Sequence, residues 1–155
     1  MWLKFLVSIC VIAFCVFLGY LASAKFRLRK KYFVQLATFN ERYLNELSYA
    51  RKPLSDFLRE YPYNGDFAKT IGAIAQRQDA RPKLGYLNKD EKKYCADYFE
   101  MLGKGDAVSQ KSFYSAQTGQ LEEKKTVSER EAKSRGELYL KLGLLAGLAF
   151  VILIV

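Results

Sequence analysis

The chain is apolar at both ends and polar between them, and this layout restricts its fold more than any other feature. The stretch Phe5–Ala24 contains no charged residue, and neither does Leu142–Val155. Almost all of the 25 basic and 16 acidic residues lie between these two stretches. Such a layout is typical of a polar domain that is held at a membrane by both of its ends.

The first apolar stretch has the length of a membrane-spanning helix. A helix over Phe5–Ala24 is about 30 Å long, which is the thickness of the hydrocarbon core of a bilayer. Basic flanks of membrane helices stay on the cytoplasmic side, so the basic run beyond this stretch predicts an outer N-terminus and an inner chain from residue 25. The residues that set this topology are Lys25, Arg27, Arg29, Lys30 and Lys31.

A cleaved signal peptide is the alternative for this segment. The run Ala22-Ser23-Ala24 has the small-x-small form of a cleavage site. The apolar stretch is longer than a usual signal core, however, and the cations beyond the site resist translocation. We favour an uncleaved anchor, and the alternative is an exported helical domain with a C-terminal membrane tail.

The C-terminal apolar stretch is short for a full crossing. As a helix from Leu138 to Val155 it spans about 27 Å, provided that Lys141 reaches the membrane surface. Ala146–Val155 is apolar on every face, which favours lipid over the core of a chain this small. We predict a C-terminal membrane helix, and its length leaves open whether it crosses the bilayer completely.

Two glycines of this helix have the spacing that lets membrane helices approach closely. Gly143 and Gly147 form a small-xxx-small pattern, although glycines also occur in membrane helices without a packing role. The partner is either another protein or the N-terminal helix, whose Gly19 and Ala13 are small.

The polar middle lacks the residues of most active sites. The chain has no histidine, which excludes Ser-His-Asp and Cys-His nucleophile systems and most zinc sites. Cys95 is the only thiol of this region, and no phosphate-binding glycine loop is present. Membrane topology and anionic lipid explain the basic run without a nucleic acid. We therefore predict no enzymatic activity, no cofactor, no metal and no nucleic-acid ligand.

The signals for secondary structure are helical almost throughout. An apolar stripe at three- and four-residue steps predicts a first helix, and Pro53 and Asn64-Gly65 open two more. Asn88, with Glu91 three residues later, caps the next helix, and residues 78 to 87 form a loop. The expected core residues are Tyr32, Leu36, Phe39, Tyr43, Leu47, Ala50, Leu54, Phe57, Leu58, Phe67, Ile71, Ile74, Tyr94, Tyr98, Met101, Leu102, Val108, Phe113 and Leu121.

The fold class is therefore all-α, with an N-terminal transmembrane helix, a small cytosolic antiparallel bundle and a long final helix that runs into a short C-terminal membrane helix. The last helix begins after Asp106, and Gly119 and Gly136 are its weak points. The expected divisions are an anchor at 1–24, a basic juxtamembrane segment at 25–31, a bundle at 32–116, a charged stalk at 117–137 and a membrane helix at 138–155.

The chain resembles the stage III sporulation protein AB family. The likeness rests on Phe99–Asp106 with Gln110 after it, on the closing block Lys141–Ile152, and on Glu46-Leu47 through Pro53-Leu54. Within the central block the family motif comprises Leu102, Gly103, Gly105, Asp106 and Gln110, residues that also suit a helix stop, a turn and a helix cap.

The resemblance implies a membrane protein of the mother cell in endospore-forming bacteria. Members of the family belong to a channel-like complex, the stage III sporulation AA–AH proteins, that links mother cell and forespore. Their helical domain is similar to the F-type platform protein of type II secretion. By that analogy it docks a cytosolic secretion-type ATPase, stage III sporulation protein AA, and homo-oligomers are compatible with such a role.

Overall fold

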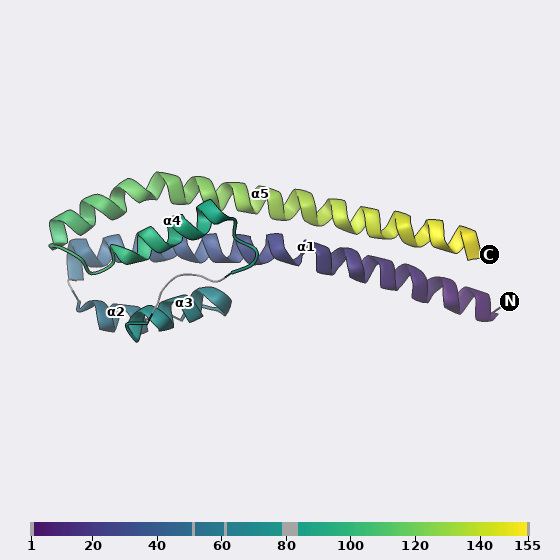
Figure 1. The fold of residues 1–155 in the computed structure, drawn as a ribbon, viewed down its shortest axis with the longest axis horizontal. Coiled ribbons are helices and arrows are strands. Elements are labelled where there is room, and N and C mark those ends of the chain that lie inside the picture. Colours follow the sequence, from purple (N-terminus) through teal and green to yellow (C-terminus); the bar gives the residue numbers. More distant parts are fainter. Residues whose placement is uncertain (1, 51, 61, 79–83, 155) are drawn as a thin grey trace. The chain divides into compact units, whose positions relative to one another are not determined.

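The structure is a computed structural model that describes residues 2–50, 52–60, 62–78 and 84–154. Its elements are all helical, and no strand occurs in these ranges, which confirms the predicted fold class (Figure 1). In chain order they are α1 (Trp2–Asn45), the π-helical turn η1 (Glu46–Ala50), α2 (Leu54–Glu60), α3 (Gly65–Ala75), α4 (Lys89–Glu100) and α5 (Ala107–Ile154).

The contacts of the chain divide it into two compact units. Unit 1 consists of Met1–Lys30 together with Val127–Val155, and unit 2 is Lys31–Thr126. Helices α1 and α5 each contribute to both units, since α1 is continuous to Asn45 and α5 begins at Ala107.

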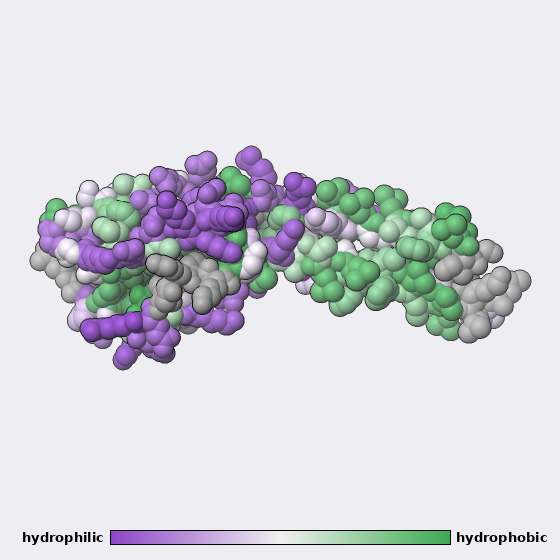
Figure 2. Space-filling view, in the orientation of Figure 1, coloured by the Kyte–Doolittle hydropathy of each residue, from purple (hydrophilic) through white to green (hydrophobic). Residues whose placement is uncertain are grey.

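Unit 1 is a pair of apolar helices with little interior. Both α1 and α5 contain a window long and apolar enough to cross a membrane, and only 6% of each window is buried. This confirms the two apolar helices predicted at the chain ends. Large hydrophobic side chains such as Phe14, Phe17 and Leu145 are more than half exposed, and Figure 2 shows this apolar surface in green. An exposed apolar surface of this kind is typical of helices that lie in a membrane.

Unit 2 is a helical bundle around a core of aromatic rings. The stripe of α1 is buried as predicted, with Tyr32, Leu36, Phe39 and Tyr43 at most 4% exposed. The Phe39 ring lies within 6.4 Å, centroid to centroid, of six other rings. These neighbours are Tyr43, Phe57, Tyr63, Phe67, Tyr98 and Phe99. Four of these pairs are edge-to-face, an arrangement that adds stability beyond the apolar area that the core buries.

The short helices follow their sequence signals. Phe57 and Leu58 of α2, and Phe67 and Ile71 of α3, are buried. The N-cap Asn88 forms the predicted capping box with Glu91 at the start of α4. The predicted loop at 78–87 is confirmed at residues 78 and 84–87, whereas 79–83 lie outside the described residues, as does the side chain of Ala50.

Two core predictions were wrong. Met101 is 39% exposed and Val108 is 75% exposed. In α5 the inward positions are Gln110 and Tyr114, one turn apart, so Val108 lies on the opposite side of the helix. Met101 is the C-cap of α4, where the chain leaves the helix for the turn at Gly103, so the three-residue step from Tyr98 no longer predicts a buried side chain.

The end of α1 and the two glycines within α5 also differ from what the sequence pattern predicts. The stripe of α1 ends in the π-helical turn η1, where the Glu46 carboxylate accepts a hydrogen bond of 2.7 Å from the Lys52 backbone N–H. Helix α5 runs through Gly119 and Gly136 without a break. A glycine costs a helix only about 1 kcal/mol relative to Ala, which the packing along α5 offsets.

Candidate functional site

The central motif forms the turn between α4 and α5. Gly103 and Gly105 adopt φ angles of 74° and 82°, a region that glycine enters without strain. The Asp106 carboxylate accepts a hydrogen bond of 3.3 Å from the backbone N–H of Ser109. Hydrogen bonds from Ser109 hold the pKa of Asp106 below its usual value. These residues therefore end one helix and cap the next, the local role that their sequence suggests.

Gln110 joins this turn to α1. The Tyr43 hydroxyl donates a hydrogen bond to Gln110 Oε1, and Gln110 Nε2 lies 3.5 Å from the Gly105 carbonyl oxygen. Gln110 is only 8% exposed, and burial raises the pKa of Tyr43. Removing either partner would leave a buried polar group without its hydrogen bond, which is costly.

The turn also packs against α2. A Cβ atom built on Gly103 would lie 2.8 Å from Leu54 Cδ2, closer than real Cβ contacts. Leu102 is half-buried and packs against the aromatic core. All five motif residues therefore lie in or directly beside one turn, at the end of unit 2 where α1 ends and α2 begins.

In unit 1 the glycines lie where the backbones of the two helices come close to one another. A Cβ atom on Gly143 would lie 2.7 Å from the Cys15 carbonyl oxygen, and one on Gly147 would lie 3.0 Å from Ile12 Cα. On the facing helix a Cβ atom on Gly19 would lie 2.5 Å from the Tyr139 carbonyl oxygen. Backbone therefore meets backbone, an approach that side chains would prevent.

The residues predicted to set the topology all lie on α1. Lys31 is the first residue of unit 2, and the other four belong to unit 1. The Arg27 guanidinium lies over the Tyr20 ring, 3.8 Å from its centroid, and also donates to the Ser23 hydroxyl. Arg29 forms an ion pair with Glu131 of α5. The side chains of Lys25, Lys30 and Lys31 are exposed. Snorkelling cations over aromatic rings are typical of the lipid–water boundary.

Sequence reasoning missed a polar network inside unit 2. Asn40 is 2% exposed and donates to the Tyr114 carbonyl and to the Thr118 hydroxyl, at 3.2 Å each. The Tyr98 hydroxyl donates to Asn40 Oδ1 at 2.9 Å. The signal was present, since Asn40 lies one turn after Leu36 on the apolar stripe of α1.

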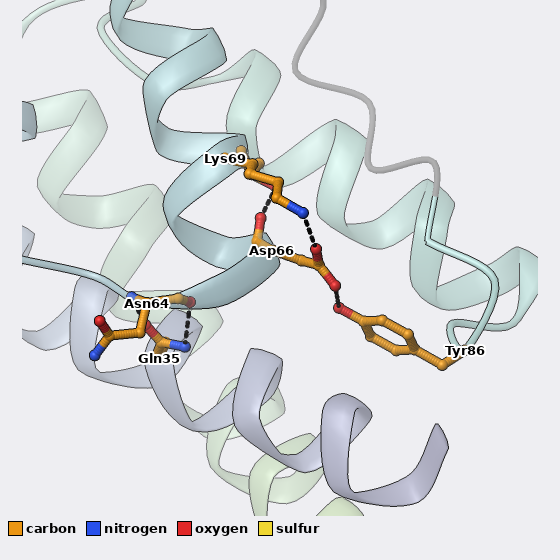
Figure 3. Close-up of polar contacts among 6 residues, drawn as sticks. Gln35, Asn64, Asp66, Lys69 and Tyr86 are labelled. Atoms are coloured by element: carbon orange, nitrogen blue, oxygen red, sulfur yellow. Dashed lines mark hydrogen bonds and ion pairs between the residues drawn. The ribbon is translucent and has the colours of Figure 1, made fainter. Parts of the chain in front are cut away.

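A second cluster that sequence reasoning missed links the start of α3 to α1 and to Tyr86. Asp66 accepts hydrogen bonds from Lys69 at 2.9 Å and from the Tyr86 hydroxyl at 3.0 Å (Figure 3). Gln35 of α1 pairs with the backbone of Asn64, accepting from its N–H at 2.8 Å and donating to its carbonyl at 3.1 Å. The bond from Lys69, and less that from Tyr86, lowers the pKa of Asp66. No spacing in the sequence indicates these contacts.

The thiol of Cys95 lies in the core of unit 2. Cys95 is fully buried, and burial, with a smaller effect of Glu91, raises its pKa to about 12. A thiol with this pKa stays protonated and inert at neutral pH. In the described ranges, no three His, Cys, Asp or Glu residues come together in a group that could hold a metal ion.

The fold and these sites together define a helical protein with two candidate membrane spans and a polar bundle between them. The family model of stage III sporulation protein AB matches residues 68–155, more than half of the chain, so the protein belongs to this family. The matched part starts within α3 and includes the α4–α5 turn and the glycines of α5. Membership implies a role in stage III of sporulation. No curated protein and no solved structure matches the chain.

Proposed function

We propose that the protein is a non-enzymatic membrane platform of the sporulation channel complex between mother cell and forespore, and that its bundle docks a cytosolic secretion-type ATPase. The observation that carries this proposal is that α1 and α5 each continue from an apolar stretch into the polar bundle. A bundle on two such helices is fixed at the membrane and leaves its other surfaces to partner proteins. Its partners are then the other stage III sporulation AA–AH proteins and, among them, the AA ATPase.

The chemistry of the bundle supports a platform and not an enzyme. The chain has no histidine, and the interior of unit 2 is filled with aromatic rings and one asparagine network. Full-length protein purified from sporulating cells should carry the AA ATPase with it. If the ATPase is missing from a complex that retains other stage III proteins, the proposal that the bundle docks the ATPase is wrong.

The proposed topology places both termini outside and the bundle in the mother-cell cytosol. It is supported by the cations beside the apolar part of α1, with Lys25 and Lys30 exposed. Within this proposal the divisions at 1–24, 25–31, 32–116, 117–137 and 138–155 are the anchor, basic segment, bundle, stalk and second membrane helix.

Thiol labelling in whole cells tests this topology. In a Cys10→Ala, Cys15→Ala background the remaining thiol, Cys95, is buried and unreactive, so a cysteine placed at the exposed Val108 reports alone. We expect Val108→Cys to react with a membrane-permeant maleimide only. Reaction with an impermeant maleimide in intact cells would reverse the topology.

The contacts in unit 1 favour the uncleaved anchor over the exported domain. Cleavage after Ala24 would remove Gly19 and its close approach to Tyr139, and with it half of the helix pair. Mass spectrometry of the mature N-terminus separates the two alternatives. A chain that starts at Lys25 would support export and exclude the platform.

A further inference from the structure

The two helices of unit 1 lie side by side in opposite directions with a constant register (Figure 1). The closest contact of each of the three glycines, and one ion pair, join residues whose numbers add up to between 158 and 160. These contacts are Ile12 with Gly147, Cys15 with Gly143, Gly19 with Tyr139, and Arg29 with Glu131. Residues of α1 and α5 whose numbers obey this relation therefore lie at the same height along the pair.

In this register the two helices place cations at the same heights. Three cations of α1 match three of α5, and we call these six residues the cation belt. In matching order they are Lys25, Arg27 and Lys30 of α1 and Arg135, Lys133 and Arg130 of α5. The belt extends over five helical steps, or about 7.5 Å. A bilayer exceeds its hydrocarbon core by about 10–15 Å, so one headgroup layer is about 5–7 Å thick. The belt therefore has about the height of one headgroup layer.

The belt region holds most of the net positive charge of the chain. Segments 25–30 and 130–135 contain seven cations and one acid, a net charge of +6, whereas the whole chain carries +9. The acid is Glu131, which pairs with Arg29. Within the described ranges, none of the six belt cations takes part in an ion pair. Their charges are therefore not matched by acids of the described chain, and they attract an external anion.

Arg27 is the member of the belt that neighbouring groups hold in place. Its guanidinium lies 3.8 Å from the centroid of the Tyr20 ring, and it donates to the Tyr20 carbonyl at 3.2 Å and to the Ser23 hydroxyl. These contacts hold the charge beside residues 20–23, at the edge of the uncharged stretch Phe5–Ala24. A guanidinium can bind a phosphate group through two parallel hydrogen bonds, and the donors that Tyr20 and Ser23 do not use remain for such a group.

The surroundings of the belt favour lipid over nucleic acid as the source of phosphate. The other five belt cations are exposed. Lys25 lies over the Phe26 ring, 5.0 Å from its centroid, and this ring stacks on Tyr139 of α5. Cations and aromatic rings together are typical of the lipid–water boundary. A leaflet also surrounds a helix pair with phosphates at one height, whereas a nucleic acid would have to lie flat on the membrane to reach the belt.

We propose that the cation belt binds the phosphate groups of anionic phospholipids, and that Arg27 is its fixed ligand. The inference rests on the membrane placement of unit 1 in the proposed function, and it goes beyond that placement because the topology was predicted from cations of α1 alone. Attraction of cations to an anionic leaflet falls off within a Debye length, so a belt at headgroup height is placed where this attraction is strongest. The protein therefore retains anionic lipid around its helix pair in preference to zwitterionic lipid.

Spin-labelled lipids test the proposal with the full-length protein in phosphatidylcholine vesicles. Electron paramagnetic resonance measures the motionally restricted fraction of spin-labelled phosphatidylglycerol and of spin-labelled phosphatidylcholine, and their ratio gives the selectivity for anionic lipid. We expect wild type to select phosphatidylglycerol by at least about threefold at low salt, and by less at high salt, because salt screens exposed charges. The Lys25→Gln, Lys133→Gln, Arg135→Gln variant should lose more than about half of this selectivity.

The matched control removes the same charge from unit 2. Lys89, Lys93 and Lys111 are exposed cations of α4 and α5, and the variant with Gln at all three should keep the selectivity of wild type. An equal loss in both triple variants would mean that net charge, and not the belt, selects the lipid. Since all six substituted side chains are exposed, circular dichroism should show equal folding of the two variants.

Arg27→Lys tests the role of the fixed ligand. The substitution keeps the charge but removes the planar group that binds phosphate through two bonds, so the selectivity should fall although the net charge is unchanged. Selectivity equal to that of wild type would mean that Arg27 is not a specific ligand.

The remaining outcomes separate the belt from the proposed function. If wild type stays in the vesicles but shows no preference for phosphatidylglycerol, the inference is wrong, whereas the platform function stands. If a carbonate wash removes wild type from the vesicles, unit 1 is not a membrane anchor and the proposed function fails as well. Binding of polyuridylate to phosphatidylcholine vesicles that carry wild type, and not to those that carry the belt variant, would assign the belt to nucleic acid and overturn the inference.

Discussion

Units 1 and 2 are built on the same two helices, yet the residues at the helix contacts differ in kind. In unit 1, α1 and α5 meet through Gly19, Gly143 and Gly147, and the large side chains point outward. In unit 2 aromatic rings fill the space between the same helices, and Phe39 and Tyr114 are fully buried. One pair of helices thus changes from backbone contact to side-chain contact along its length.

The difference is the one expected when unit 1 lies in lipid and unit 2 lies in water. In water, burial of apolar rings drives the association of helices and is worth about 25 cal/mol for each Å² removed from solvent. In lipid this driving force is absent, because acyl chains are as apolar as leucine, and close backbone packing has to replace it. The two units should therefore respond differently to the same type of substitution.

The largest effect is expected from the aromatic core. Phe39→Ala removes the ring that six others contact, and its 0% exposure leaves no route for water to compensate. We expect a loss of about 3–5 kcal/mol in the free energy of unfolding of unit 2. Urea unfolding in nanodiscs, monitored by circular dichroism, measures this loss of free energy. Val108→Ala is the control at an exposed position. An equal effect of both substitutions would contradict the aromatic core.

The glycine contact of unit 1 should be the next most sensitive. Gly143→Leu forces side-chain atoms into the Cys15 backbone and should separate the helices, at a cost of about 1–3 kcal/mol. Gly136→Leu is the matched control, because a Cβ atom there meets nothing within 4 Å.

Electron paramagnetic resonance can follow this separation. Spin labels at the exposed Leu21 and Leu140, in a Cys10→Ala, Cys15→Ala background, report the distance between the helices. We expect a longer mean distance for Gly143→Leu only, together with unchanged thermal unfolding of unit 2. If the distance stays the same, the glycines do not hold the helix pair together.

A smaller effect is expected at the α4–α5 turn. Gly103→Ala places a side chain at a φ angle of 74° and 2.8 Å from Leu54, which should cost about 1–2 kcal/mol of unit 2 stability. Gly119→Ala, in a helix with open space, should instead be neutral or stabilising. Thermal unfolding of the two variants measures this difference in stability. Equal melting temperatures would mean that the motif glycine has a role other than backbone geometry.

Sequence periodicity predicted those parts of the fold that depend on which face is apolar. The buried stripe from Tyr32 to Tyr43 and the capping box at Asn88 are local signals, and the structure confirms both. The two apolar helices follow from length and composition alone. The errors at Met101 and Val108 lie at helix ends, where the pattern does not show which side of the helix faces inward.

Contacts between distant residues could not be predicted in this way. The Asn40 network joins α1 to residues about 60 to 80 positions later, and the Asp66–Tyr86 pair depends on how the loop before α4 returns to α3. Periodicity describes one element at a time, whereas these features arise when elements meet.

The Asp66–Tyr86 contact provides the smallest expected effect and a dependence on pH. The pKa of Asp66 is lowered in the folded state by hydrogen bonds from Lys69 and Tyr86, so the ionised carboxylate stabilises unit 2 above its unfolded pKa of about 4. This contribution is lost as the pH falls through the lower, folded pKa. Tyr86→Phe should therefore lower stability at pH 7 by less than about 1 kcal/mol, since the site is near the surface.

The difference between Tyr86→Phe and wild type should shrink as the pH falls below about 4, because a protonated Asp66 no longer gains from the hydroxyl. Urea unfolding in nanodiscs at pH 7 and at low pH measures this convergence. Tyr49→Phe is the control, since that hydroxyl belongs to an exposed ring and its loss should leave stability unchanged at both pH values. A deficit of Tyr86→Phe that is the same at both pH values would mean that the Tyr86 ring packing, and not its bond to Asp66, holds the loop on α3.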